Sequence, residues 1–88
     1  MLDIPVHIVA QACSHPLRVE ILELLAGSSR SPLSVSKELG ANLGQVSYHF
    51  SVLRKLGAIE LVETKPRRGA TEHFYTACWR ARVAAERI

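Results

Sequence analysis

The sequence predicts a mostly α-helical domain with one β-hairpin, and two observations support this fold class. Among its 88 residues, 48% are hydrophobic but only 6% are aromatic, so we expect a core built mainly from aliphatic side chains. Apolar side chains recur at helical spacing along most of the chain, and after Gly57 the pattern changes to short β-branched and aromatic runs. A chain of this length is expected to form one domain, spanning residues 1–88.

Two helices are expected in the first third of the chain. Residues 4–13 predict a short first helix, because Pro5 is tolerated in a first turn. Residues 15–26 predict a second helix with Ser14 as its N-cap, since a serine hydroxyl accepts a hydrogen bond from a free backbone N–H there. Its apolar positions repeat every three or four residues, and Gly27 is expected to end it.

A pair of helices joined by a tight turn follows. Residues 33–39 and 43–56 are the expected helices, with Gly40 as the stop of the first and Asn42 as the N-cap of the second. Gly57 is expected to end the second helix. The side chains expected to pack this pair are apolar, namely Val35, Leu39, Val46, Phe50 and Leu53. Such a helix-turn-helix unit is the element that places a helix in the major groove of duplex DNA.

A β-hairpin is expected after the helix pair. Residues 59–64 and 72–76 predict the two strands, and the segment 65–69 between them is a turn-rich basic loop. Residues 77–88 predict a last helix with Trp79 on one face. The order of helix, helix, helix, turn, helix, hairpin and helix is that of a winged helix-turn-helix, so the fold class is mostly α with a β-hairpin wing.

The solvent-facing side of residues 43–56 carries an unusual set of side chains. Gln, Ser and Tyr gather there, whereas a merely solvated helix surface favours Glu and Lys. Gln reads adenine, and Ser and Tyr bond bases or phosphates, so this set favours DNA contact. Basic residues of the expected wing reach a flanking phosphate or the minor groove. The expected DNA-binding residues are Asn42, Gly44, Gln45, Ser47, Tyr48, Ser51, Arg54, Lys55, Lys65, Arg67 and Arg68.

Positive charge gathers in the second half of the chain. The net charge is +3, but residues 1–42 hold three basic and four acidic residues, whereas residues 43–88 hold eight basic and four acidic ones. An uneven distribution of this kind favours a polyanionic partner, although ordinary surface solvation explains it equally well when it is taken alone.

Three stretches of the chain carry a family resemblance. They are HPLRVEILELL at residues 15–25, VSYHFSVLRKLG at residues 46–57 and RGATEHFY at residues 68–75. They are similar to the second helix, the recognition helix and the wing with its following strand in a non-metal-sensing branch of the ArsR-type (arsenic-repressor-like) regulators. The resemblance implies a dimeric bacterial transcription factor, usually a repressor, that binds duplex DNA and dimerises through its first and last helices.

A metal switch is not expected. Metal-sensing members of that family place a Cys-x-Cys pair where this chain has Ser, Pro and Leu at residues 31–33. A second family site needs Asp and His on the last helix, and residues 77–88 have neither. His7, His15 and His73 share no metal-ligand spacing. We therefore expect no metal and no cofactor.

The two cysteines, Cys13 and Cys78, are expected to be small core residues. They form no C-x-x-C pair, so a reducing cytoplasm is the expected location, and a redox switch would need the first and last helices to pack together. The sequence also predicts no secretory signal and no membrane span.

Catalysis is not expected either. Ser47 and His49 lie two apart on a helix and therefore point in different directions. His49 falls at the edge of the buried face, where a structural histidine with one hydrogen bond is favoured over a DNA contact. The alternative function is a winged-helix module that binds another protein, such as an antagonist of a regulator, which Leu43 at the helix start and the short last helix support.

Overall fold

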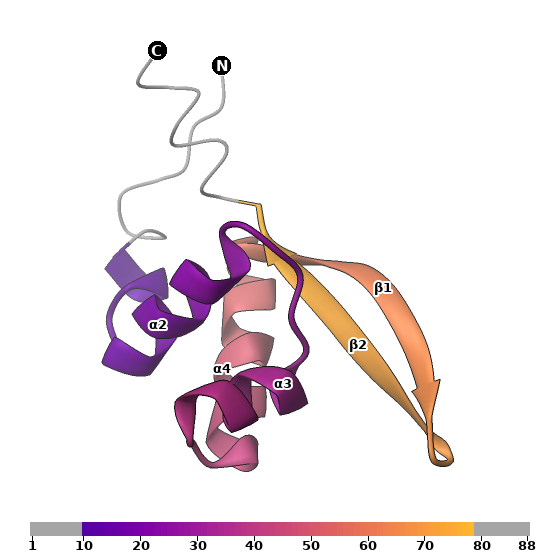
Figure 1. Ribbon diagram of the computed structural model, residues 1–88. Coiled ribbons are helices and arrows are strands. Elements are labelled where there is room, and N and C mark those ends of the chain that lie inside the picture. Colours follow the sequence, from indigo (N-terminus) through magenta and orange to yellow (C-terminus); the bar gives the residue numbers. More distant parts are fainter. Residues whose placement is uncertain (1–9, 79–88) are drawn as a thin grey trace.

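The structure is a computed structural model that describes residues 10–78 of the chain. Its elements are α2 (Pro16–Leu25), α3 (Pro32–Leu39), α4 (Leu43–Lys55), β1 (Ile59–Arg67) and β2 (Ala70–Ala77). The three helices gather together and the hairpin projects from them (Figure 1). The predicted winged helix-turn-helix is therefore confirmed. Of the expected first helix, residues 10–13 are described: residues 10–12 are helical, and Cys13 already lies in a turn. The expected last helix lies outside the described residues except at its start.

α2 is capped by His15 and not by Ser14, so the expected N-cap is wrong by one residue. Nδ1 of His15 accepts a hydrogen bond from the Leu17 N–H at 3.2 Å. Pro16 explains this, because helical backbone angles are disfavoured for a residue that precedes proline. His15 accordingly has φ −131° and ψ 133°. The helix ends at Leu25, which is one residue earlier than expected.

α3 and α4 begin and end close to where the sequence predicts. Ser31 caps α3, which therefore starts at Pro32, one residue earlier than expected. Gly40 ends α3 with φ 62°, a left-handed backbone that favours glycine. Asn42 caps α4, and the helix runs to Lys55, one residue short of the expected end.

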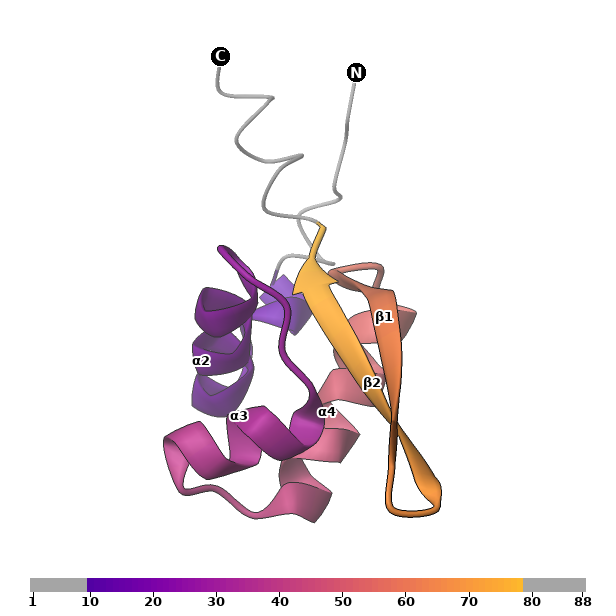
Figure 2. The same cartoon turned by 45° about the vertical axis from the view of Figure 1, so that its right-hand side comes forward.

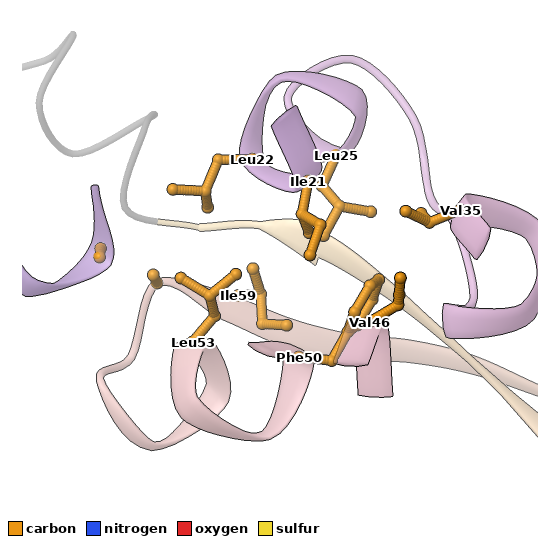
Figure 3. Close-up of a cluster of buried hydrophobic side chains, with 10 residues drawn as sticks. Ile21, Leu22, Leu25, Val35, Val46, Phe50, Leu53 and Ile59 are labelled. Carbon is orange, nitrogen blue, oxygen red and sulfur yellow. The ribbon is translucent and has the colours of Figure 1, made fainter. Parts of the chain in front are cut away.

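A small core of aliphatic side chains and one phenyl ring joins the three helices to the base of the hairpin. Figure 3 shows α2, α3 and α4 pointing their side chains toward one another and toward β1. The buried hydrophobic residues are Ala12, Ile21, Leu22, Leu25, Val35, Val46, Phe50, Leu53, Ala58 and Ile59. The apolar faces predicted for α2 and α4 are thus the ones that are buried.

The hairpin is longer than predicted, and the segment 65–69 is not a loop. β1 continues through Lys65 to Arg67, and only Arg68 and Gly69 form the turn. Both turn residues have positive φ, 45° and 81°, as a two-residue turn of the I′ type requires. β2 extends to Ala77, so the prediction that Ala77 starts the last helix is wrong. The basic side chains are therefore carried by a two-stranded arm and its turn.

Two features set the direction of this arm. The strand pairing shifts between Leu61 and Glu63, which leaves Val62 as the extra residue of a β-bulge. Arg30, in the segment before α3, pairs with Tyr75 of β2 through two backbone hydrogen bonds of 3.0 and 2.9 Å. Because β2 is held on both edges at this point, the base of the wing is fixed to the helix-turn-helix unit.

Candidate nucleic-acid interface

α4 presents a polar, solvent-exposed face along its whole length. Gly44, Tyr48 and Lys55 follow one another along the centre of this face, and all three are exposed. Tyr48 is 61% exposed, which is unusual for so large a ring. The helix sequence LGQVSYHFSVLRK contains no acidic residue. A helix with these properties suits contact with an anionic surface.

The start of α4 uses two of the predicted DNA contacts for its own structure. Oδ1 of Asn42 accepts a hydrogen bond from the Gln45 N–H at 3.0 Å, which occupies one of the acceptor sites of this amide. A Cβ added at Gly44 would lie 3.0 Å from the same oxygen. A glycine at this position therefore keeps the cap uncrowded, besides leaving the backbone open to an approaching strand.

A groove of about 520 Å³ separates α4 from the wing. Ser47, Ser51 and Arg54 line it from α4, and the hairpin contributes Thr71 and His73. The guanidinium of Arg54 lies over the Tyr75 ring at 5.8 Å from its centre, which holds this cation against the hairpin. Three of the predicted contact residues of α4 are thus brought together here.

A carboxylate lies at the base of this groove and ties the wing to α3. The Ser31 hydroxyl, fully buried at 0% exposure, donates a hydrogen bond to Glu72. Arg67 donates to the other carboxylate oxygen at 3.2 Å, and the Glu72 side chain is only 12% exposed. The hydrogen bond from Ser31, followed by that from Arg67, lowers the pKa of Glu72 below its usual range. The carboxylate therefore stays ionised and fixes the angle of the arm.

The wing cations differ in how far they are paired. Arg67 forms the ion pair with Glu72, and Lys65 lies 3.9 Å from Glu63 and 5.1 Å from the centre of the Phe74 ring. Arg68 at the tip forms no ion pair with any residue between 10 and 78. Of the three predicted wing contacts, Arg68 is the one whose charge is left for a partner.

A second hollow, of about 640 Å³, lies on the other side of α4, against the start of α2. Figure 2 shows α2 and the hairpin on opposite sides of the α3–α4 unit. The seven lining residues all carry polar or exposed backbone groups, and they are His15, Arg18, Asn42, Gly44, Gln45, Tyr48 and His49. None of them is acidic. We call this space the α2-side hollow.

His49 is the buried member of that lining. It is 7% exposed, its Nδ1 accepts a hydrogen bond from Nε of Arg18 at 3.0 Å, and its ring centre lies 4.5 Å from that of His15. Burial lowers the pKa of His49 below the ordinary histidine value, and the nearby His15 and Arg18 lower it further. The prediction of a buried histidine with one hydrogen bond is confirmed.

Arg18 and His15 were missed as candidate site residues. His15 is the N-cap of α2 and Arg18 lies in its first turn, but the sequence does not show that this end of α2 meets the start of α4. Lys55 was predicted as a contact and lines neither hollow, although it is exposed near the end of α4.

The cysteines differ from the prediction. Cys13 is exposed, so its expected place in the core is wrong. Cys78 is half-buried and its Sγ donates to the Gly57 carbonyl at 2.8 Å. Neither is in a disulfide. Within residues 10–78, no cluster of three or more His, Cys, Asp or Glu is placed to hold a metal ion. No helix in that range has the length and apolar character needed to cross a membrane.

The fold and the polar face of α4 define a winged helix-turn-helix protein of the DNA-binding class. A model of the helix-turn-helix domain family matches residues 14–62, which is more than half of the chain. The chain belongs to this helix-turn-helix domain family. No curated protein matches the sequence at a significant level.

Solved structures show the same fold. Reduced HlyU from Vibrio cholerae N16961 superposes with a TM-score of 0.70 at 23% identity, over 91% of this chain and 80% of that one. The homodimeric winged helix-turn-helix DNA-binding domain Mb0332 from Mycobacterium bovis superposes with a TM-score of 0.68 at 26% identity, over 92% of this chain and 74% of that one. An ArsR-like transcriptional regulator from Rhodococcus sp. RHA1 superposes with a TM-score of 0.70 at 26% identity, over 93% of this chain and 71% of that one. These matches confirm the ArsR-type resemblance and the class of DNA-binding transcriptional regulator.

Proposed function

We propose that this protein is a sequence-specific regulator of transcription that binds duplex DNA as a homodimer and represses the genes it controls. α4 lies in the major groove, and Gln45, Ser47 and Tyr48 meet base edges there. The wing tip with Arg68 reaches the backbone or the minor groove. The observation that carries the proposal is the exposed, acid-free face of α4, with the groove beside the wing on one side and the α2-side hollow on the other.

Dimerisation through the first and last helices is part of the proposal. The homodimeric state of the Mb0332 domain supports it, and most of the two helices concerned lies outside residues 10–78. A dimer with two-fold symmetry reads two half-sites about 34–36 Å apart, or a multiple of that spacing. The bound sequence is then a pseudo-palindrome. We keep the cytoplasm as the location and a non-enzymatic role, with no metal or cofactor, as parts of the same proposal.

Selection of bound genomic fragments with the purified protein tests this function. The expected result is a set of fragments that share a pseudo-palindrome with this spacing and lie across promoters. Binding to random duplex should also weaken steeply with salt, in proportion to the phosphates neutralised. If Arg67→Ala combined with Arg68→Ala left affinity and salt dependence unchanged, the role of the wing would be wrong.

One observation favours a second function, the binding of another protein. Leu43 at the start of α4 is 44% exposed, and Leu61 and Val62 near the base of the hairpin are exposed as well. A protein-binding module would fail to retain random duplex even at low salt. The fragment selection therefore separates the two functions, because only a DNA-binding protein returns enriched fragments.

A further inference from the structure

We propose that the α2-side hollow seats the sugar–phosphate backbone of one DNA strand while α4 lies in the major groove. His15, Arg18 and His49 are the residues that donate to its phosphate oxygens. This inference rests on the proposed function, and it assigns a binding role to three side chains that are not among the expected DNA-binding residues. It is carried by the geometry and the donor chemistry of the hollow.

Both imidazoles line the α2-side hollow, and both carry a hydrogen-bond donor. Nδ1 of His15 accepts from a backbone N–H, and Nδ1 of His49 accepts from a guanidinium N–H. Since neither of those partners is able to accept, the proton of each neutral ring must reside on Nε2. Nε2 of His49 has no hydrogen-bond partner among residues 10–78, and the residue is only 7% exposed. A buried donor of this kind needs an acceptor such as a phosphate oxygen.

Arg18 supplies the positive charge. Its Nε donates to His49, and its Nη1 donates to the Gln11 carbonyl at 2.8 Å and to the Ser14 hydroxyl at 3.3 Å. These bonds hold the guanidinium in one orientation and leave the two N–H groups of Nη2 without a partner in the described part of the chain. Arg18 forms no ion pair there either. A fixed, uncompensated guanidinium suits phosphate better than a flexible surface lysine does.

The position of the hollow matches the shape of the DNA groove. On a helical wheel of 100° per residue, Gln45 and His49 fall on one side of Tyr48, and Ser47 and Arg54 fall on the other. The first pair lines the α2-side hollow and the second pair lines the groove beside the wing. A helix in the major groove, which is about 12 Å wide, has one backbone strand on either side. Each strand therefore meets one of the two spaces.

The experiment compares salt dependence of binding to a random-sequence duplex, with the full chain and three variants. Arg18→Gln should weaken binding about tenfold near 0.1 M salt and reduce the salt slope by about one. His15→Asn keeps an acceptor for the helix cap but loses the ring donor, and it should weaken binding severalfold. Lys37→Gln removes one charge from an exposed site of α3 that lines neither space, and its salt slope should equal that of the wild type. Thermal unfolding of each variant shows whether it remains folded.

A second measurement locates the contact. Duplexes with a single neutral methylphosphonate, moved along one strand of a selected site, should weaken wild-type binding at one or two positions beside each half-site. The same duplexes should have no further effect on Arg18→Gln, because the contact is already lost.

The outcomes separate this inference from the proposed function. If the wild type bound duplex DNA, but Arg18→Gln and His15→Asn matched it in affinity, salt slope and methylphosphonate response, the inference would be overturned while the proposed function remained. A slope lowered equally in Lys37→Gln would also overturn it. Absence of wild-type binding at low salt would overturn the proposed function itself. If Arg18→Gln unfolds, His15→Asn decides.

Discussion

The two sides of α4 differ in whether their arginine is paired with a carboxylate. On the α2 side, Arg18 is held by neutral acceptors and its positive charge is uncompensated. On the wing side, Arg67 is paired with Glu72, and the same carboxylate satisfies the buried hydroxyl of Ser31. The first side is ready for an anion, whereas the second uses part of its charge to hold the hairpin in place. A count of basic residues therefore overstates what the wing offers to DNA.

The largest effect is expected from a core residue on which both sides depend. Phe50 is 3% exposed, follows His49 on α4, and packs its ring against that of Tyr75 with 5.5 Å between centres. Phe50→Ala should lower the free energy of unfolding by about 3–5 kcal/mol, because it removes buried area and leaves a cavity. Urea denaturation measures this. Ser51→Ala, on the exposed face beside it, should stay within about 0.5 kcal/mol of the wild type. Equal losses in the two variants would contradict the role of Phe50 as shared core.

Charge removal on the wing side should produce an asymmetric result. Glu72→Gln keeps a carbonyl oxygen for the Ser31 hydroxyl but releases Arg67, so affinity for random duplex should rise severalfold and the salt slope by about one. Arg67→Gln alone should change the slope much less than Arg18→Gln, since its charge is already neutralised. Fluorescence titrations at four or five salt concentrations give these slopes. A fall in affinity for Glu72→Gln, with unchanged thermal stability, would mean that the Glu72 carboxylate and DNA phosphate do not compete for Arg67.

The two sides should also lose stability in different pH ranges. The pKa of His49 is lowered by burial, with smaller contributions from His15 and Arg18 of α2, and the other neighbours in the hollow are uncharged amides and a tyrosine. Since the unfolded chain then binds more protons, the free energy of unfolding should fall as pH drops below about 6.5. The pKa of Glu72 is lowered mainly by the Ser31 hydrogen bond. Its contribution to the free energy of unfolding is therefore fully present above about pH 4.3 and is lost only in more acid solution.

Unfolding curves between pH 8 and pH 3 should therefore show two separate steps. His49→Gln, whose amide replaces both ring nitrogens as acceptor and donor, should remove the step near pH 6 and leave the acid step. A step near pH 6 that persisted in His49→Gln would contradict its assignment to His49.

The sequence predicts local features of this molecule well and long-range ones poorly. Gly40, Asn42 and the exposed residues of α4 were found because caps, turns and helical periodicity depend on neighbours within four residues. The bond from Arg18 to His49 spans 31 positions and that from Ser31 to Glu72 spans 41. Nothing in local pattern pairs such residues, so neither the α2-side hollow nor the carboxylate that holds the wing was predicted.

The hairpin shows a different kind of limit. Pro66 and the basic residues around it have the composition of a loop, so the sequence predicts short strands at 59–64 and 72–76 with this loop between them. In the structure Pro66 is paired with Thr71 inside the ladder. A two-stranded sheet tolerates this because an edge strand has backbone N–H groups that need no partner. Composition thus located the arm correctly but not the length of its strands.

The smallest effect is expected at Asn42, where helix capping and DNA contact make opposite demands. Asn42→Asp keeps the capping oxygen and adds a negative charge at the start of α4, which should leave stability equal or raise it by about 0.3–1 kcal/mol. The same charge lines the α2-side hollow, so DNA affinity should fall about tenfold at low salt and recover toward the wild-type value as salt increases. Asn42→Ser, which caps without charge, should bind within about twofold of the wild type. Equal affinities for the Asp and Ser variants would show that no phosphate approaches this end of α4, and the contrast between the two sides would then reduce to a difference in internal packing.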